Sequence, residues 1–119
     1  MVARIGSDTG VEGMSDVERG LGGAELGAEL GEVATLVQFS SAFCQPCRAT
    51  RRILADVAAV VPGVTHIEID AEERLALVRA LAVERTPTVL VLDQEGRIVR
   101  RAEGQPRKNE VIAALGAAL

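Results

Sequence analysis

The residues best suited to chemistry in this sequence are two cysteines separated by two residues, Cys44-Gln45-Pro46-Cys47. A short apolar run with several β-favouring residues, 34–39, precedes them, and a run with helical spacing, 53–60, follows them. The cysteines therefore belong to the junction between a strand and a helix, where the first N–H groups of the helix have no partner. These donors and the positive end of the helix dipole stabilise a thiolate. The sequence predicts a reactive dithiol.

A Cys-x-x-Cys pair is also found as half of a zinc site, which normally has four ligands. The chain has no third cysteine and a single histidine, His66, so zinc binding would require two copies of the chain. A redox dithiol needs no further ligand. We therefore expect redox chemistry with no bound metal or organic cofactor. Arg48 directly follows Cys47, and a cation beside the dithiol favours the thiolate.

Charge and composition exclude other classes of function. The net charge is −4, but residues 1–32 hold seven acids and two arginines, so the rest of the chain is nearly neutral. There is no Tyr or Trp, and the only aromatic residues are Phe39 and Phe43. A nearly neutral domain without aromatic stacking platforms gives no basis for binding nucleic acid or anionic membranes.

The sequence has no apolar stretch of about eighteen residues, the length a membrane-spanning helix needs. The first ten residues lack the apolar core of a secretory signal. As written, the sequence predicts a cytoplasmic protein. The alternative is an extracytoplasmic protein whose leader or anchor is missing from this sequence.

Hydrophobic periodicity divides the rest of the chain into alternating strands and helices. Pro62-Gly63 ends the first helix, and Asp93 to Gly96 is typical of a hairpin turn. We expect strands at 33–39, 64–70, 88–92 and 97–102, and helices at 46–60, 72–81 and 107–118. The order β-α-β-α-β-β-α predicts an α/β fold with a central mixed sheet that is flanked by helices on both faces.

The first 32 residues differ from this pattern, with eight of the twelve glycines and no proline. Charged, Gly-rich ends are usually solvated. We therefore expect residues 1–32 to be a flexible acidic extension, ending in a weakly structured lead-in, and residues 33–119 to be the folded domain. Leu21, Leu26 and Leu30 could form one side of a short helical turn in that lead-in. The functional alternative is an acidic docking segment.

Two segments together resemble the thioredoxin family. Residues 39–48, with Cys44-Gln45-Pro46-Cys47 inside them, resemble the active-site segment of that family. Thr86-Pro87-Thr88, about forty residues later, stands where the family has its cis-proline loop. The resemblance covers residues 33–119 and implies a thioredoxin fold. It also implies that Cys44 is the nucleophile, that Cys47 resolves the mixed disulfide, and that Thr86 and a cis Pro87 bind the substrate.

Three positions depart from the family pattern. The usual tryptophan before the first cysteine is Phe43, which keeps an apolar shelf without an N–H donor. The usual glycine after that cysteine is Gln45, expected to be exposed and to tune the redox couple or the partner contact. The usual buried acid is Gln38, an amide that does not titrate. The family often pairs that acid with a lysine on its third strand, and the residue that resembles this lysine in position is His66. We hypothesise that His66 accepts the Cys47 proton in place of the missing acid. The alternative is a strand histidine without a role.

The resemblance predicts a thiol:disulfide oxidoreductase that reduces or exchanges protein disulfides through a mixed disulfide. It further implies a partner reductase as the source of electrons, and we expect a monomer. Gln38 and Phe43 keep a second hypothesis open, a thioredoxin-like binding module that senses redox state and turns over slowly.

Overall fold

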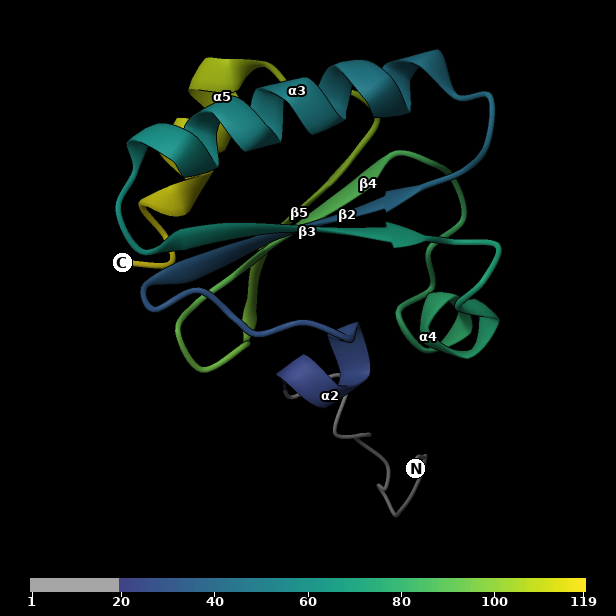
Figure 1. Cartoon of the computed structure of the whole chain (residues 1–119), viewed down its shortest axis with the longest axis horizontal. Coiled ribbons are helices and arrows are strands. Elements are labelled where there is room, and N and C mark those ends of the chain that lie inside the picture. Colours follow the sequence, from purple (N-terminus) through teal and green to yellow (C-terminus); the bar gives the residue numbers. More distant parts are fainter. Residues whose placement is uncertain (1–19) are drawn as a thin grey trace.

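A four-stranded sheet in the order β3-β2-β4-β5 forms the centre of the fold (Figure 1). Strand β2 (Ala34–Ser40) lies parallel to β3 (Val64–Asp70) and antiparallel to β4 (Thr88–Leu92). Strand β4 pairs antiparallel with β5 (Ile98–Glu103). This computed structural model describes residues 20–119, so what the sequence predicts for earlier residues lies outside the described part.

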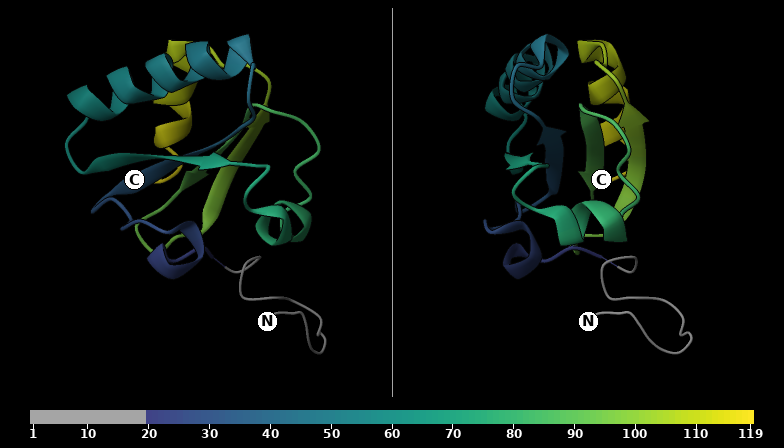
Figure 2. Two further views of the ribbon diagram at one scale, coloured as in Figure 1. Left: turned by 45° about the vertical axis from the view of Figure 1, so that its right-hand side comes forward. Right: turned by 90° about the vertical axis from the view of Figure 1, so that its right-hand side faces the viewer.

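Helices cover both faces of the sheet, as Figure 2 shows in its edge-on view. Helices α3 (Gln45–Val60) and α5 (Lys108–Leu115) lie on one face, and α2 (Gly23–Leu26) and α4 (Leu75–Ala80) lie on the other. After α2 the elements follow the order β-α-β-α-β-β-α. The mixed sheet with helices on both sides confirms the predicted fold class.

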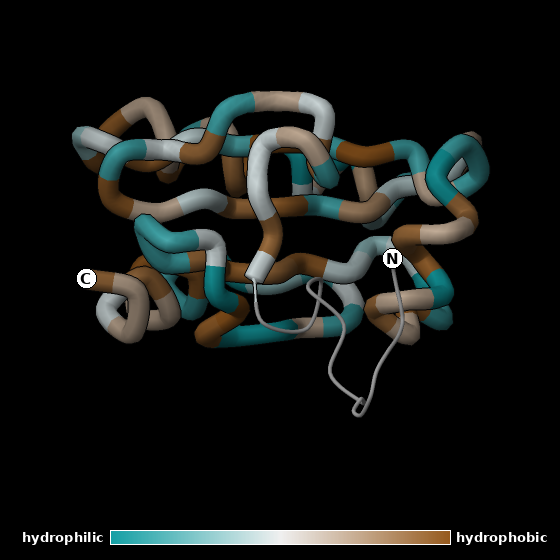
Figure 3. The backbone as a smooth tube through the Cα atoms, turned by 90° about the horizontal axis from the view of Figure 1, so that it is seen from below, coloured by the Kyte–Doolittle hydropathy of each residue, from teal (hydrophilic) through white to brown (hydrophobic). Residues whose placement is uncertain are grey.

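The alternation of side chains along β2 divides the core into two clusters. Leu36 points to the α3 face and packs with Leu54, whereas Phe39 points to the opposite face. Strand β2 is buried along its whole length because it lies between β3 and β4 and is covered from both sides. Figure 3 shows this pattern as hydrophobic stretches, in brown, along the strands in the middle of the molecule.

Among the described helices, none is both long enough and apolar enough to cross a membrane.

Most predicted bounds agree with the structure within one residue, but two helices are shorter. The sequence predicts a helix over 72–81, whereas α4 begins at Leu75. The Asp70 carboxylate accepts the Glu72 N–H (2.9 Å), and the Asp70 carbonyl accepts the Glu73 N–H (3.0 Å). These bonds make a turn in place of the first helical turn. Helix α5 ends at Leu115, before three residues in a turn.

Residues 20–32 pack against the sheet, which differs from the weakly structured lead-in that the sequence predicts. Leu21 and Leu26 are buried in the same cluster as Phe39, and Leu30 packs against that cluster. The Leu21 N–H donates to the Gly96 carbonyl (2.8 Å). Gly96 has a φ of 86°, and the Leu21 backbone comes so close that no side chain would fit there. The folded part of the chain therefore begins earlier than residue 33.

Candidate active site at the start of helix α3

The two cysteines lie at the N-terminus of α3, at the end of the sheet where β2 finishes. Cys44 and Cys47 are joined by a disulfide, with their Cα atoms 5.2 Å apart. Cys44 is partly exposed, whereas Cys47 is only 1% exposed. The sulfur that solvent and a partner can reach therefore belongs to Cys44, and the buried sulfur beside it belongs to Cys47.

Cys44 is also the N-cap residue of α3. Its Sγ accepts the backbone N–H of Cys47 at 3.2 Å, and Pro46 occupies an early helical position that needs no N–H donor. A sulfur that already accepts a helical N–H is in the position where negative charge is stabilised best. The arrangement provides the strand-to-helix junction that the sequence predicts.

The loop before β4 lies opposite the dithiol. The peptide bond between Thr86 and Pro87 is cis. The Thr86 carbonyl oxygen lies 4.0 Å from Cys44 Sγ, and the Thr86 and Ser41 hydroxyls are 2.7 Å apart. Residues more than forty positions apart in the sequence are thus brought together around one sulfur.

The remaining loop residues face solvent. Phe43 is 95% exposed and has a φ of 59°, a left-handed conformation that is uncommon for a residue with a large side chain. Gln45, Pro46 and Arg48 are also exposed. Phe43 precedes the dithiol in the sequence and Arg48 follows it. A partner that approaches Cys44 would therefore meet an exposed aromatic ring and an exposed guanidinium group.

Gln38 lies beneath Cys47 and is fully buried. Its Nε2 donates to the Cys47 carbonyl (2.7 Å) and to Ser40 Oγ (2.9 Å), and its Oε1 lies 3.2 Å from His66 Nε2. Because Gln38 donates both amide hydrogens, one to Cys47 and one to Ser40, the group that faces His66 is its amide oxygen. His66 Nε2 therefore carries a hydrogen and donates it.

His66 lies beside Gln38, although the strand register pairs Gln38 with Glu68 and His66 with Leu36. However, its Nε2 is engaged as a donor to Gln38, so this nitrogen is not free to accept a proton from Cys47. The proton relay from Cys47 to His66 stays a prediction.

Three residues near this site were not singled out by the sequence. Ser40 Oγ donates to Glu68 Oε2 (2.8 Å), and Arg51 makes two hydrogen bonds to the same carboxylate (2.7 and 2.8 Å). Arg51 thus forms an ion pair with Glu68. The signal for these contacts is the strand alternation, which places Gln38 and Ser40 on the same face of β2, beneath α3.

A comparison with known protein families agrees with this geometry. The family model for thioredoxin matches residues 25–117. The chain belongs to the thioredoxin family. The match begins within α2, so part of the predicted lead-in falls inside the family domain.

Individual thioredoxins are similar over a shorter part of the chain. Thioredoxin H-type of Ricinus communis is 34% identical over 76 residues, which are 64% of this chain and 63% of that protein. The match thus spans less than two thirds of that relative. The crystal structure of thioredoxin NaTrxh from Nicotiana alata is 25% identical, with a TM-score of 0.64, and covers 73% of this chain and 74% of that one. A mutant thioredoxin from Halobacterium salinarum has a TM-score of 0.67 at 21% identity, covering 73% of this chain and 75% of that one.

Within residues 20–119, no three His, Cys, Asp or Glu side chains lie close enough together to hold a metal ion. Cys44 and Cys47 are bonded to each other. A zinc site shared between two copies of the chain stays an alternative interpretation of the Cys-x-x-Cys pair.

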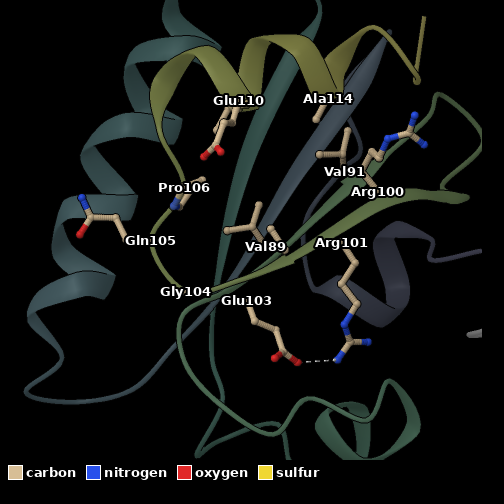
Figure 4. Close-up of a pocket in the computed structure, with 12 residues that line it drawn as sticks. Val89, Val91, Arg100, Arg101, Glu103, Gly104, Gln105, Pro106, Glu110 and Ala114 are labelled. Atoms are coloured by element: carbon tan, nitrogen blue, oxygen red, sulfur yellow. Dashed lines mark ion pairs between the residues drawn. The ribbon is translucent and has the colours of Figure 1, made fainter.

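A groove continues from the cis-proline loop of this thioredoxin domain along β5 (Figure 4). The Gly104 N–H donates to the Pro87 carbonyl (2.8 Å), which connects the groove to the loop. Glu103 lies near two arginines, Arg85 (3.7 Å) and Arg101 (3.9 Å). The groove has a volume of about 440 Å³ and lies between β5 and α5, with valines in its floor and charged residues at its rim.

The electrostatics of the polar side chains follow from burial and contacts. Burial lowers the pKa of His66 from its ordinary value of 6.5, although the Glu68 carboxylate raises it. The hydrogen bond from Arg51 lowers the pKa of Glu68 below its ordinary 4.5, against burial, and the bond from Ser40 lowers it further. At neutral pH the site therefore holds a neutral histidine and a charged glutamate.

These two shifts predict that acid destabilises the protein in two stages. For both groups the folded pKa is lower than the unfolded pKa, so the unfolded state binds more protons and stability falls as the pH falls. We expect the free energy of unfolding to decrease first below pH 6.5 through His66, and again below pH 4.5 through Glu68. Urea unfolding at a series of pH values measures the effect.

Two variants separate the stages. His66→Asn should remove the first decrease and Glu68→Gln the second. An NMR titration of the His66 ring gives its pKa directly, and a value above 6.5 in the folded protein would contradict the assignment.

Proposed function

We propose that this chain is a thiol:disulfide oxidoreductase that reduces or exchanges protein disulfides, with Cys44 as nucleophile and Cys47 as resolving cysteine. The observation that carries the proposal is the pairing of a partly exposed sulfur at the N-cap of α3 with a buried sulfur one helical turn away, opposite the Pro87 loop.

The reaction proceeds in two exchanges. The Cys44 thiolate attacks one sulfur of the substrate disulfide, and the other substrate sulfur leaves as a thiolate, which gives a mixed disulfide. Cys47 then loses its proton to solvent and attacks Cys44 Sγ, and the second substrate thiolate leaves. The products are a dithiol substrate and the Cys44–Cys47 disulfide. Two electrons from a partner reductase restore the protein dithiol.

The loop at Thr86 and Pro87 supports substrate binding in this proposal. Its backbone carbonyl lies beside Cys44, where an extended substrate segment would find a hydrogen-bond acceptor. Exposed Phe43, Gln45 and Arg48 would contact the partner from the opposite side. The chemistry needs only two sulfurs, so the proposal includes no metal or organic cofactor.

The setting is part of the same proposal. We place the chain in the cytoplasm, where a reductase keeps such dithiols reduced, and we expect it to act as a monomer. Its composition supports this, because a single Cys-x-x-Cys pair is more typical of a redox motif than of a disulfide scaffold.

A second candidate is a redox-sensing module with slow turnover. The observation that favours it is Gln38, an amide beneath Cys47 that does not accept a proton. Such a module would form the same disulfide without supporting rapid exchange with substrates.

Insulin reduction by dithiothreitol distinguishes the two functions. An oxidoreductase accelerates the precipitation of the reduced insulin chains at micromolar protein concentration, whereas a sensor leaves it close to the rate with dithiothreitol alone. The matched control is Cys44→Ser, which removes the attacking sulfur and should give the background rate. If the unmodified protein also gives the background rate, the proposed function is wrong.

A further inference from the structure

A closed series of polar contacts begins and ends on helix α3. The Cys47 carbonyl accepts from Gln38 Nε2 (2.7 Å), which also donates to Ser40 Oγ (2.9 Å). Ser40 Oγ donates to Glu68 (2.8 Å), and Glu68 accepts two bonds from Arg51 (2.7 and 2.8 Å). Arg51 follows Cys47 by four residues, which is about one helical turn. We call these five residues the polar ring.

The direction of the hydrogen bonds in the polar ring is fixed. The Cys47 carbonyl and the Glu68 carboxylate only accept, and the Arg51 guanidinium only donates. Ser40 must therefore donate its single hydrogen to Glu68 and accept from Gln38 with a lone pair. The Ser40 hydroxyl does both with a single oxygen atom, whereas an alanine at this position would do neither, so the ring depends on the residue type there.

The polar ring holds the part of α3 that carries the resolving cysteine. Farther along the helix, Leu54 and Val57 pack on the apolar part of the sheet. Beneath the first turns the same face of the sheet is polar, with Gln38 on β2 and Glu68 on β3 paired across the strands. Toward β2 and β3, hydrogen bonds therefore set the position of Cys47 relative to the sheet, whereas Val89, the β4 neighbour of Gln38, is apolar.

We propose that Ser40 and Glu68 are positioning residues for the resolving step, in which Cys47 attacks Cys44 Sγ of the mixed disulfide. This inference rests on the proposed function. Attack on a disulfide requires the incoming sulfur to align with the bond that breaks, and small displacements slow such reactions strongly. Cys44 lies outside the polar ring, at the exposed cap. The ring acts on Cys44 only through the Cys47 N–H that its sulfur accepts, so we expect a larger effect on the second exchange than on the first.

Reaction of the reduced protein with 5,5′-dithiobis(2-nitrobenzoate) separates the two exchanges. Attack by Cys44 on this disulfide releases one thionitrobenzoate. Attack by Cys47 on the resulting mixed disulfide releases the second thionitrobenzoate, and the Cys47 proton goes to the buffer. With the reagent in large excess over the protein, the first exchange becomes the faster step, and stopped-flow absorbance follows the two releases as separate phases.

In Ser40→Ala we expect the second phase to slow about tenfold, as for the loss of a hydrogen bond to a charged group, and the first phase to change less than about twofold. Ser40→Thr keeps a hydroxyl and should restore the second phase to within about threefold of the unmodified rate. Glu68 lies on a partly exposed strand position, and Glu68→Ala should slow the second phase about fivefold. If Ser40→Ala does not fold, the second phase of Glu68→Ala tests the positioning role.

The matched control is Thr50→Ala, which removes a buried hydroxyl of α3 that donates to the Pro46 carbonyl (2.7 Å) outside the polar ring. Both of its phases should stay within about twofold of the unmodified rates, since no member of the ring is lost. Equal slowing in Thr50→Ala and Ser40→Ala, or an unchanged second phase in Ser40→Ala and Glu68→Ala, would overturn the positioning role. If the unmodified protein itself releases no second thionitrobenzoate, the proposed function fails instead.

Discussion

Replacing Cys47 with serine is expected to convert the protein into a trap for its own substrates. Cys44 remains at the cap of α3 and still attacks a substrate disulfide, but the buried sulfur that would release the substrate is gone. The remaining route is attack by a thiol from solution. That route lacks the intramolecular advantage, worth an effective concentration of about 10⁵ M or more, so release slows by about a thousandfold or more.

Non-reducing gel electrophoresis followed by mass spectrometry measures the trapped complex. Cys47→Ser incubated with oxidised insulin should give one covalent adduct per chain, and dithiothreitol should remove it. Cys44→Ser is the control and should give no adduct, because Cys47 is only 1% exposed. If instead Cys44→Ser forms the adduct and Cys47→Ser does not, the roles of the two cysteines are reversed.

Replacing Leu21 with alanine should destabilise the whole domain, although Leu21 lies in the segment that the sequence assigns to a flexible lead-in. Its side chain is 1% exposed and packs in the cluster that contains Phe39 and Leu92. Truncation of a buried leucine leaves a cavity and costs about 2–5 kcal/mol of unfolding free energy. Urea unfolding followed by far-ultraviolet circular dichroism measures this loss.

Leu119→Ala is the matched control for that experiment. The Leu119 side chain is 74% exposed, so the same substitution should change the unfolding free energy by less than about 0.5 kcal/mol. If Leu21→Ala and Leu119→Ala unfold at the same urea concentration, residues 20–32 do not contribute to the core, and the boundary predicted at residue 33 stands.

The parts of this structure that could be predicted from the sequence are those set by local patterns. The dithiol at a strand-to-helix junction follows from one apolar run before Cys44 and one after it. The hairpin at Gly96 and the buried strand 88–92 follow from turn chemistry and from a continuous apolar run. The order of elements then leaves few arrangements for the sheet.

The parts that could not be predicted depend on contacts between distant segments. The hydrogen bond from Ser40 to Glu68 requires the register that pairs β2 with β3, which no local pattern contains. The burial of Leu21 depends on the Gly96 turn, about seventy-five residues later. A glycine-rich segment has little helical preference of its own, so its order comes from the surface against which it packs.

The cap of α3 provides a reporter of the chemistry at Cys44. The Cys47 amide hydrogen points at Cys44 Sγ, 3.2 Å from the donor nitrogen, so its magnetic environment depends on the charge of that sulfur. The chain contains no Trp or Tyr whose fluorescence could be followed. The backbone amide resonance of Cys47 in an NMR spectrum can therefore follow the ionisation of Cys44 Sγ directly. The Cys44 side chain needs no label, and no substrate is required.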